Sequence, residues 1–336
     1  KRQTDDNTDA DIYVKDRQTG ELELISTSGS GGEANGRSFV PDISSDGRYI
    51  AFESEASNLV GGDTNAKWDI FVRDRADDSM ERISLSAELL NADDNSFLPK
   101  ISADGRYVAF ESFAENLIFG DTNGVADVYV YDRDFQQTTR ASEGYQVGID
   151  SNDRSLGVSM SDDGQMVAFQ SWASNLVPGD ENGVMDVFLY TLGDAAPIRM
   201  SEVDGVGGNE ASALPALSGD GSIVVFESLA DNLGPADDDG FWDAFVYEVS
   251  SGDLAAASPI GELEAEDVFN LDNAGGGNFA DVAEGTYYTH GVRFLANNGI
   301  TTGTSPTTYS PDAAVTRGQM ATFLFRPVSY THLTLP

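Results

Sequence analysis

The sequence repeats itself with a period of about 58 residues. An Asp-Gly pair recurs with spacings of 58, 59 and 57 residues, at positions 46, 104, 163 and 220. A second marker, an Asp followed by alternating aliphatic and aromatic residues, recurs at positions 11, 69, 127, 186 and 243. Because two separate markers keep the same spacing, each unit is expected to fold into the same supersecondary structure.

Each repeat contains four short segments that are typical of β-strands. In the second complete unit they are residues 97–102, 107–112, 127–132 and 138–142, with β-branched and aromatic residues at alternating positions. The Asp-Gly pair supplies the positive φ that a tight hairpin between the first two strands requires. Four strands per repeat predict the blades of an all-β propeller, with a sandwich or a solenoid as alternatives.

The repeats cover residues 10–258, as four complete units preceded by a half unit that holds only the last two strands. We therefore expect about 4.5 blades. The half unit either closes the ring with strands from the other end or follows further blades. Since the sequence begins with Lys1 rather than Met, we expect a propeller that is truncated at its N-terminus.

The strings of residues 41–52 and 69–74 carry a resemblance to a known family. Similar strings recur at residues 99–110, 127–132, 159–169 and 215–226. They resemble the TolB-type (WD40-like) propeller repeats, which also occur beside the catalytic domains of prolyl oligopeptidases. The resemblance implies a propeller and indicates little about function, because one fold carries many activities.

The sequence changes character after residue 258. An acidic and then glycine-rich linker is expected at residues 259–278. Apolar residues at helical spacing in 286–298 and 316–326 predict two helices, and thus a small α-helical C-terminal module over residues 279–326. Residues 327–336 depart from the acidic, glycine-rich style of the chain, and we expect a non-native tail there.

Four ordered segments of the C-terminal module carry a second resemblance: Phe279-Ala280-Asp281-Val282, residues 299–303, Tyr309-Ser310-Pro311-Asp312 and residues 315–321. They resemble one S-layer homology module. The resemblance implies binding to cell-wall polysaccharide, with Thr316 and Arg317 at the start of the motif as the glycan-binding residues. An arginine suits this role because its planar fork pairs with a carboxylate. Alternatively, Thr316 caps a helix and Arg317 is solvated.

The loop between the second and third strands of each unit carries carboxylate or amide oxygens at relative positions 1, 3 and 7 beside glycine. Closely spaced oxygen ligands are what calcium prefers, so these loops are candidate calcium sites. As an alternative, the same side chains bond their own backbone and form Asx turns. The candidate residues are Asp63, Asn65 and Asp69; Asp121, Asn123 and Asp127; Asp180, Asn182 and Asp186; and Asp237, Asp239 and Asp243.

Composition and charge exclude several classes of function. The 57 acidic and 19 basic residues give a formal net charge of −38, so nucleic acid and anionic membranes would be repelled. The chain has no cysteine and therefore no thiolate metal site. No apolar run reaches the ~18–20 residues that span a bilayer, so no membrane span is expected.

We predict no catalytic residue and no cofactor other than calcium. The chain lacks a G-x-S-x-G motif, and its two histidines, His290 and His332, lie outside the repeats. The Asp of the Asp-Gly turn recurs in every unit, which indicates a structural role, whereas a glycosidase needs one particular pair of acids in a single pocket. The three tryptophans, Trp68, Trp172 and Trp242, are either packing anchors or part of a rim that contacts sugar or peptide.

Together these observations predict a non-catalytic, extracellular protein of the cell surface. The C-terminal module would tether the chain to cell-wall polysaccharide, and the propeller would bind an unknown protein or glycan. One alternative is a propeller that belongs to a secreted hydrolase, a peptidase or a glycosidase. Another is a periplasmic TolB-like adaptor.

Overall fold

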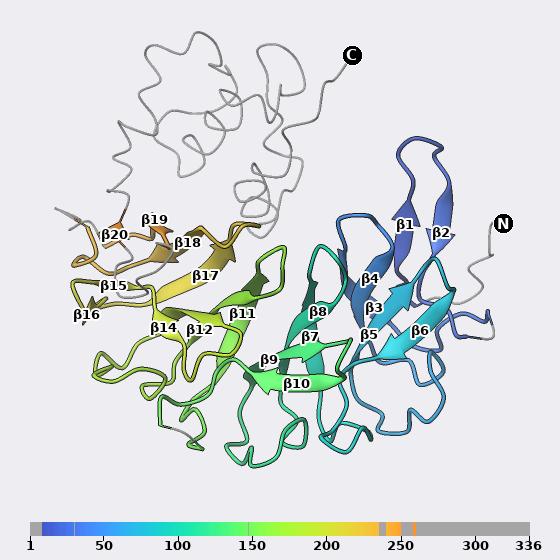
Figure 1. Ribbon diagram of the computed structural model, residues 1–336, viewed down its shortest axis with the longest axis horizontal. Helices are drawn as coiled ribbons and strands as arrows, with labels where there is room; N and C mark the ends of the chain where they lie inside the picture. Colours follow the sequence, from blue (N-terminus) through green and yellow to red (C-terminus); the bar gives the residue numbers. More distant parts are fainter. Residues whose placement is uncertain (1–8, 30, 147, 235–239, 250–257, 260–336) are drawn as a thin grey trace, which may run out of the picture. The chain divides into compact units, whose positions relative to one another are not determined.

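The computed structural model describes residues 9–29, 31–146, 148–234, 240–249 and 258–259. The chain divides into two units, residues 1–259 and 260–336, and all described residues lie in the first. The regular elements of these residues are β-strands (Figure 1). The expected C-terminal module at 279–326, its two helices and the tail at 327–336 lie outside the described residues.

Four sheets of four antiparallel strands follow one another along the chain, and within each sheet the strands pair in chain order. We number these sheets as blades one to four. Their strands are β3 (Ser38–Ile43), β4 (Tyr49–Ser54), β5 (Asp69–Asp74), β6 (Ser79–Arg82); β7 (Ser96–Ile101), β8 (Tyr107–Ser112), β9 (Asp127–Asp132), β10 (Gln137–Arg140); β11 (Ser155–Met160), β12 (Met166–Ser171), β13 (Asp186–Thr191), β14 (Ile198–Arg199); β17 (Ser212–Leu217), β18 (Ile223–Ser228), β19 (Asp243–Glu248) and β20 (Ser258–Pro259). The predicted all-β propeller with four-stranded blades is thereby confirmed.

Two shorter sheets complete the described fold. The expected N-terminal half blade is a hairpin of β1 (Tyr13–Lys15) and β2 (Leu22–Leu24), and among the described residues each pairs only with the other. A second hairpin, β15 (Glu202–Val203) and β16 (Val206–Gly207), lies between blades three and four in the chain. The fourth blade is completed by its own strand β20.

Neighbouring blades pack through apolar side chains of their middle strands. One buried cluster joins Ile70 and Val72 of β5 to Val108 and Phe110 of β8. Within the second blade, Phe110 stacks on Tyr129 with ring centroids 6.0 Å apart. Corresponding ring pairs occur in the other three blades, at 5.9, 5.8 and 5.7 Å. Burial of each large side chain stabilises the fold by about 1.5–3 kcal/mol.

The Asp-Gly turns fit between blades as well as within them. Gly164, with a φ of +70°, follows Asp163 in the hairpin of the third blade. A Cβ atom at this glycine would lie 2.5 Å from the ring of Tyr107 in the second blade. The turn therefore requires glycine for two reasons, its left-handed backbone and the close approach of the neighbouring blade.

The first strand of each blade contains an irregularity that the sequence patterns did not predict. The pairing register shifts around one residue of positive φ: Val40, Leu98, Gly157 and Leu214. In three blades the backbone N–H of that residue donates to a side chain of the preceding blade. The pairs are Leu98 with Glu53 at 2.8 Å, Gly157 with Glu111 at 2.5 Å and Leu214 with Gln170 at 2.7 Å.

Candidate functional site

A buried arginine faces the acidic loop in each of the first three blades. Arg82, Arg140 and Arg199 end the outermost strands β6, β10 and β14. Each arginine follows the last Asp of its loop by 13 residues. This spacing is regular, but the sequence patterns described above did not include it. Their side chains are 3–6% exposed.

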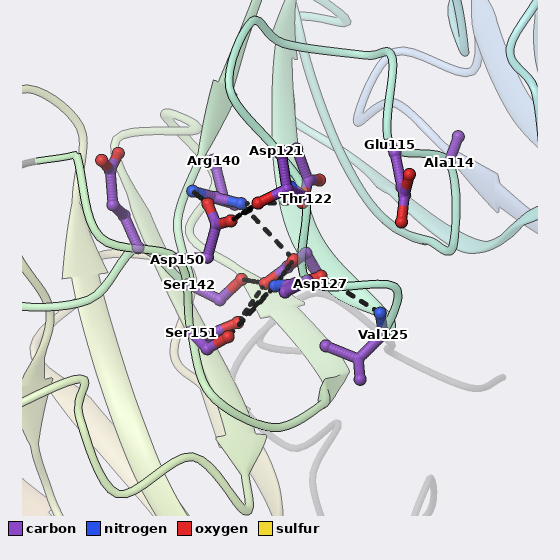
Figure 2. A network of polar contacts seen from close by, with 12 residues as sticks. Ala114, Glu115, Asp121, Thr122, Val125, Asp127, Arg140, Ser142, Asp150 and Ser151 are labelled. Atoms are coloured by element: carbon purple, nitrogen blue, oxygen red, sulfur yellow. Dashed lines mark hydrogen bonds and ion pairs between the residues drawn. The ribbon is translucent and has the colours of Figure 1, made fainter.

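In the second blade the arginine gathers three carboxylates (Figure 2). Nη1 of Arg140 lies 3.2 Å from Oδ1 of Asp121 and 3.6 Å from Oδ2 of Asp127. Nη2 donates to Oδ1 of Asp150 at 2.7 Å. The guanidinium thus pairs with two acids of the loop and with Asp150 from a second segment, and a buried charge of this kind is stable only when it is paired.

Asp127 has further partners on its other sides. The amide nitrogen of Asn123 donates to Oδ2 of Asp127 at 2.7 Å, and the hydroxyl of Ser151 donates to Oδ1 at 2.8 Å. Burial nevertheless raises the pKa of Asp127 above its ordinary value, since the charged form loses solvation. The amide oxygen of Asn123 accepts from the N–H of Val125 at 3.1 Å, which is the Asx turn of the alternative interpretation.

The first and third blades repeat this arrangement. Nη1 of Arg82 lies 2.9 Å from Oδ1 of Asp63 and 3.3 Å from Oδ2 of Asp69. In the third blade the guanidinium lies near the corresponding pair, Asp180 at 3.2 Å and Asp186 at 4.0 Å. Burial raises the pKa of Asp186 to about 6. The remaining predicted residues of these blades, Asn65 and Asn182, donate to the last Asp of their loops at 2.9 and 2.7 Å.

The fourth loop differs from the first three. Asp243 begins β19, whereas Asp237 and Asp239 lie outside the described residues. The position 13 residues after Asp243 is Ala256, so the arginine of the other blades has no counterpart in the sequence there.

The three described loops do not fit a calcium ion. Calcium takes six to eight oxygen ligands at about 2.3–2.6 Å. Here two carboxylates of each loop face a guanidinium, which lies on the side where a shared cation would bind. No group of three or more acidic or histidine side chains among the described residues is arranged to hold a metal ion. Calcium binding stays a prediction for the fourth loop, with Asp237, Asp239 and Asp243.

A row of aromatic side chains crosses the first two blades near the ends of strands β3, β5, β7 and β8. Phe39 stacks on Trp68 with ring centroids 5.8 Å apart, and Trp68 lies 6.2 Å from Phe97. Phe97 meets Phe113 edge to face at 6.5 Å. We call Phe39, Trp68, Phe97 and Phe113 the aromatic row. Its end members are about two-fifths exposed, at 39% for Phe39 and 42% for Phe113.

A cavity of about 340 Å³ opens at the end of the aromatic row, between loops of the second and third blades. Phe113 lies on its wall and follows β8, while Val125 belongs to the loop between β8 and β9. Asp153 and Arg154 precede β11, and Trp172 follows β12. From the sequence, Trp172 is expected to be either a packing anchor or part of a rim that contacts sugar or peptide. The structure places it in the wall of a cavity.

A comparison with protein families finds one match, to the S-layer homology domain, over residues 278–321. The chain carries an S-layer homology domain. The match includes Thr316 and Arg317, the residues that the resemblance implied for glycan binding. No curated protein matches the chain. Among the described residues, no helix is long and apolar enough to cross a bilayer.

Solved structures similar to this chain include TolB and proteases. TolB from Acinetobacter baumannii is 18% identical over 72% of this chain and 47% of TolB, with a TM-score of 0.38. The tricorn protease is 14% identical over 74% of this chain and 24% of the protease, with a TM-score of 0.43. The β-propeller domain of the Trilobed protease from Pyrococcus furiosus is 13% identical over 79% of this chain and 67% of the domain, with a TM-score of 0.43. The chain spans less than half of TolB and of the tricorn protease.

Proposed function

We propose that this chain is a non-catalytic protein of the cell surface. Its S-layer homology domain tethers it to cell-wall polysaccharide, and its propeller presents the loops around the aromatic row to a protein or glycan partner. The match of residues 278–321 to the S-layer homology domain carries the proposal, because modules of this type are cell-wall binders.

Thr316 and Arg317 are proposed to make the contact with the wall polymer. The guanidinium of Arg317 offers two parallel N–H donors that match the oxygens of a carboxylate or a similar anionic group. The net charge of −38 would repel an anionic polymer from most of the surface. A local cation is therefore needed wherever such a polymer binds.

The geometry of the repeated turn acids supports the non-catalytic part of the proposal. Asp46 accepts a hydrogen bond from the hydroxyl of Ser44 at 2.7 Å and another from the N–H of Arg48 at 2.9 Å. Asp104 accepts the same two bonds in the next blade. These acids organise their own hairpins, whereas glycoside hydrolysis requires one pair of carboxylates about 5–10 Å apart that faces the substrate.

Co-sedimentation with purified cell-wall sacculi tests the tether. The full chain should pellet with sacculi and stay in the supernatant after the secondary wall polymers have been stripped. A chain that ends at Pro259 should stay in the supernatant in both cases. In the full chain, Arg317→Ala should lower the pelleted fraction and Arg317→Lys should restore part of it. Equal pelleting of the full and the shortened chain would contradict the proposal.

A further inference from the structure

The cavity between the second and third blades is lined by Arg154, an exposed arginine that forms no ion pair with another residue that the structure describes. The backbone of Arg154 is fixed, since its carbonyl accepts from the N–H of Trp172 at 3.1 Å. Its guanidinium lies over the indole of Trp172, with Cζ 4.1 Å from the ring centroid. No ion pair among the described residues includes Arg154, although acidic residues outnumber basic ones by 57 to 19.

Comparison of the repeats shows why this guanidinium is left without a carboxylate. Arg37 occupies the corresponding position in the first blade and also lies over a tryptophan, Trp68, at 5.5 Å. Its partner Glu55 accepts from Nε at 2.7 Å. The position of Glu55 is taken by Trp172 in the third blade, 117 residues later. The repeat has thus exchanged an internal ion pair for an aromatic ring, and the donors of Arg154 are available to a ligand.

The cavity also offers an acceptor and further aromatic surface. The side chain of Asp153 is exposed, and its Oδ1 accepts from the backbone N–H of Arg154 at 2.8 Å. Phe113 also lines the cavity, and its contact with Phe97 joins the cavity to the aromatic row of the first two blades. Donor, acceptor and aromatic faces border one open depression of about 340 Å³, which leaves room for a single sugar ring.

These features select a neutral sugar as the ligand. Each sugar hydroxyl both donates and accepts, so it can accept from the guanidinium of Arg154 and donate to the carboxylate of Asp153. The C–H face of a pyranose ring packs against an aromatic ring in the same way as other apolar surface does. An acidic chain is disfavoured here because the exposed carboxylate of Asp153 lines the same cavity as Arg154, and because the net charge of −38 repels polyanions.

We infer that the cavity at Arg154 and Trp172 binds one sugar unit of a neutral oligosaccharide. The next units of the same oligosaccharide lie along the aromatic row. The inference rests on the proposed function, in which this face of the propeller binds a partner. Binding of a soluble oligosaccharide does not require the wall tether, so the two proposals fail independently.

Isothermal titration calorimetry of the full chain tests the inference. The probes are neutral hexasaccharides of glucose, xylose, mannose and N-acetylglucosamine, and hexagalacturonate serves as the acidic probe. At least one neutral probe should bind with a dissociation constant between about 10 µM and about 1 mM. Trp172→Ala and Arg154→Ala should each weaken that binding at least about tenfold, while Trp172→Phe retains part of it.

Trp242→Ala is the matched control, since Trp242 is exposed at 46% and does not line the cavity. Its affinity should equal that of the unchanged chain, and all variants should pellet with sacculi to the same extent. The inference is overturned if no neutral probe binds, if binding survives both cavity substitutions in folded protein, or if hexagalacturonate is the only ligand. Near-UV circular dichroism establishes the folding of each variant.

Discussion

Glu111 accepts a hydrogen bond at 2.5 Å from the backbone N–H of Gly157, across the boundary between the second and third blades. Glu53 makes the same contact to Leu98 one blade earlier, and Gln170 makes it to Leu214 one blade later. Since Gln170 is uncharged, the contact requires an acceptor oxygen and no negative charge. The carboxyl of Glu111 is therefore a buried ionisable group in a place where an amide suffices.

Glu111→Gln should stabilise the protein at neutral pH. Burial raises the pKa of Glu111 to about 7, whereas an unfolded glutamate titrates near 4.5. Between these values the folded protein binds more protons than the unfolded chain, so the free energy of unfolding falls as the pH rises. The variant should be more stable above pH 7 by on the order of 1–3 kcal/mol, and equal to the unchanged chain below about pH 4. Urea unfolding across this pH range measures it, with the exposed Glu115→Gln as control, and a difference independent of pH would refute it.

Gly164→Ala should destabilise the fold more than Gly179→Ala. Both glycines have positive φ, +70° and +77°. An alanine in this left-handed conformation lowers the free energy of unfolding by about 1 kcal/mol in both variants. A Cβ at position 164 would also meet the ring of Tyr107, whereas nothing lies within 4 Å of a Cβ at position 179. The additional cost at position 164 should be about 1–3 kcal/mol. Equal midpoints of urea denaturation for the two variants would show that the blades do not approach as closely as described.

Arg140→Met should be among the most damaging substitutions in the propeller. It leaves Asp121 and Asp127 buried without an opposing charge, which costs about 3–5 kcal/mol. A second substitution, Asp121→Asn, should recover part of this loss because it removes one unpaired charge. Lys67→Met is the control, since its ion pair with Asp94 is partly exposed and contributes less than about 1 kcal/mol. Chemical denaturation of the unchanged chain, Arg140→Met, Arg140→Met with Asp121→Asn, and Lys67→Met checks the order of their free energies of unfolding.

Calcium should not change the stability of the first three blades, because an arginine already pairs with the carboxylates of each acidic loop. The measurement compares the thermal midpoint of the full chain in chelator and in about 1 mM calcium, a concentration that loads extracellular calcium modules. An unchanged midpoint is expected. An increase that Asp121→Asn abolishes would show that calcium displaces Arg140. An increase that instead depends on Asp237 and Asp239 would place calcium in the fourth loop.

The repeat period and the strand patterns were sufficient to predict the blades. β8 and β9 begin and end at the residues expected from the alternation of 107–112 and 127–132. The fourth strand ends earlier than expected, at Arg140, because the following Ser142 turns its hydroxyl to Asp127 and to the N–H of Val128. Local patterns identify strands, whereas side-chain contacts to a neighbouring strand decide where each strand stops.

The partners of the acidic loops could not be predicted from the loops alone. Asp63 and Asn65 have the oxygens and the spacing of cation ligands, and the cation that faces Asp63 is Arg82, 19 residues further along the chain. A search for arginines at the repeat period would have found it. The availability of Arg154 has a similar origin, since it depends on a change from Glu55 to Trp172 between units that otherwise look alike.

Capture of a labelled sugar by wall-bound protein tests the central claim most directly, since it requires the tether and the display face together. Sacculi are mixed with the full chain and with the neutral hexasaccharide that calorimetry selects, and the label is counted in the pellet. The account predicts that the sugar pellets with the full chain, stays in solution with the chain ended at Pro259, and stays in solution with Trp172→Ala although that variant itself pellets. Sugar that remains in solution while the unchanged full chain pellets would contradict it.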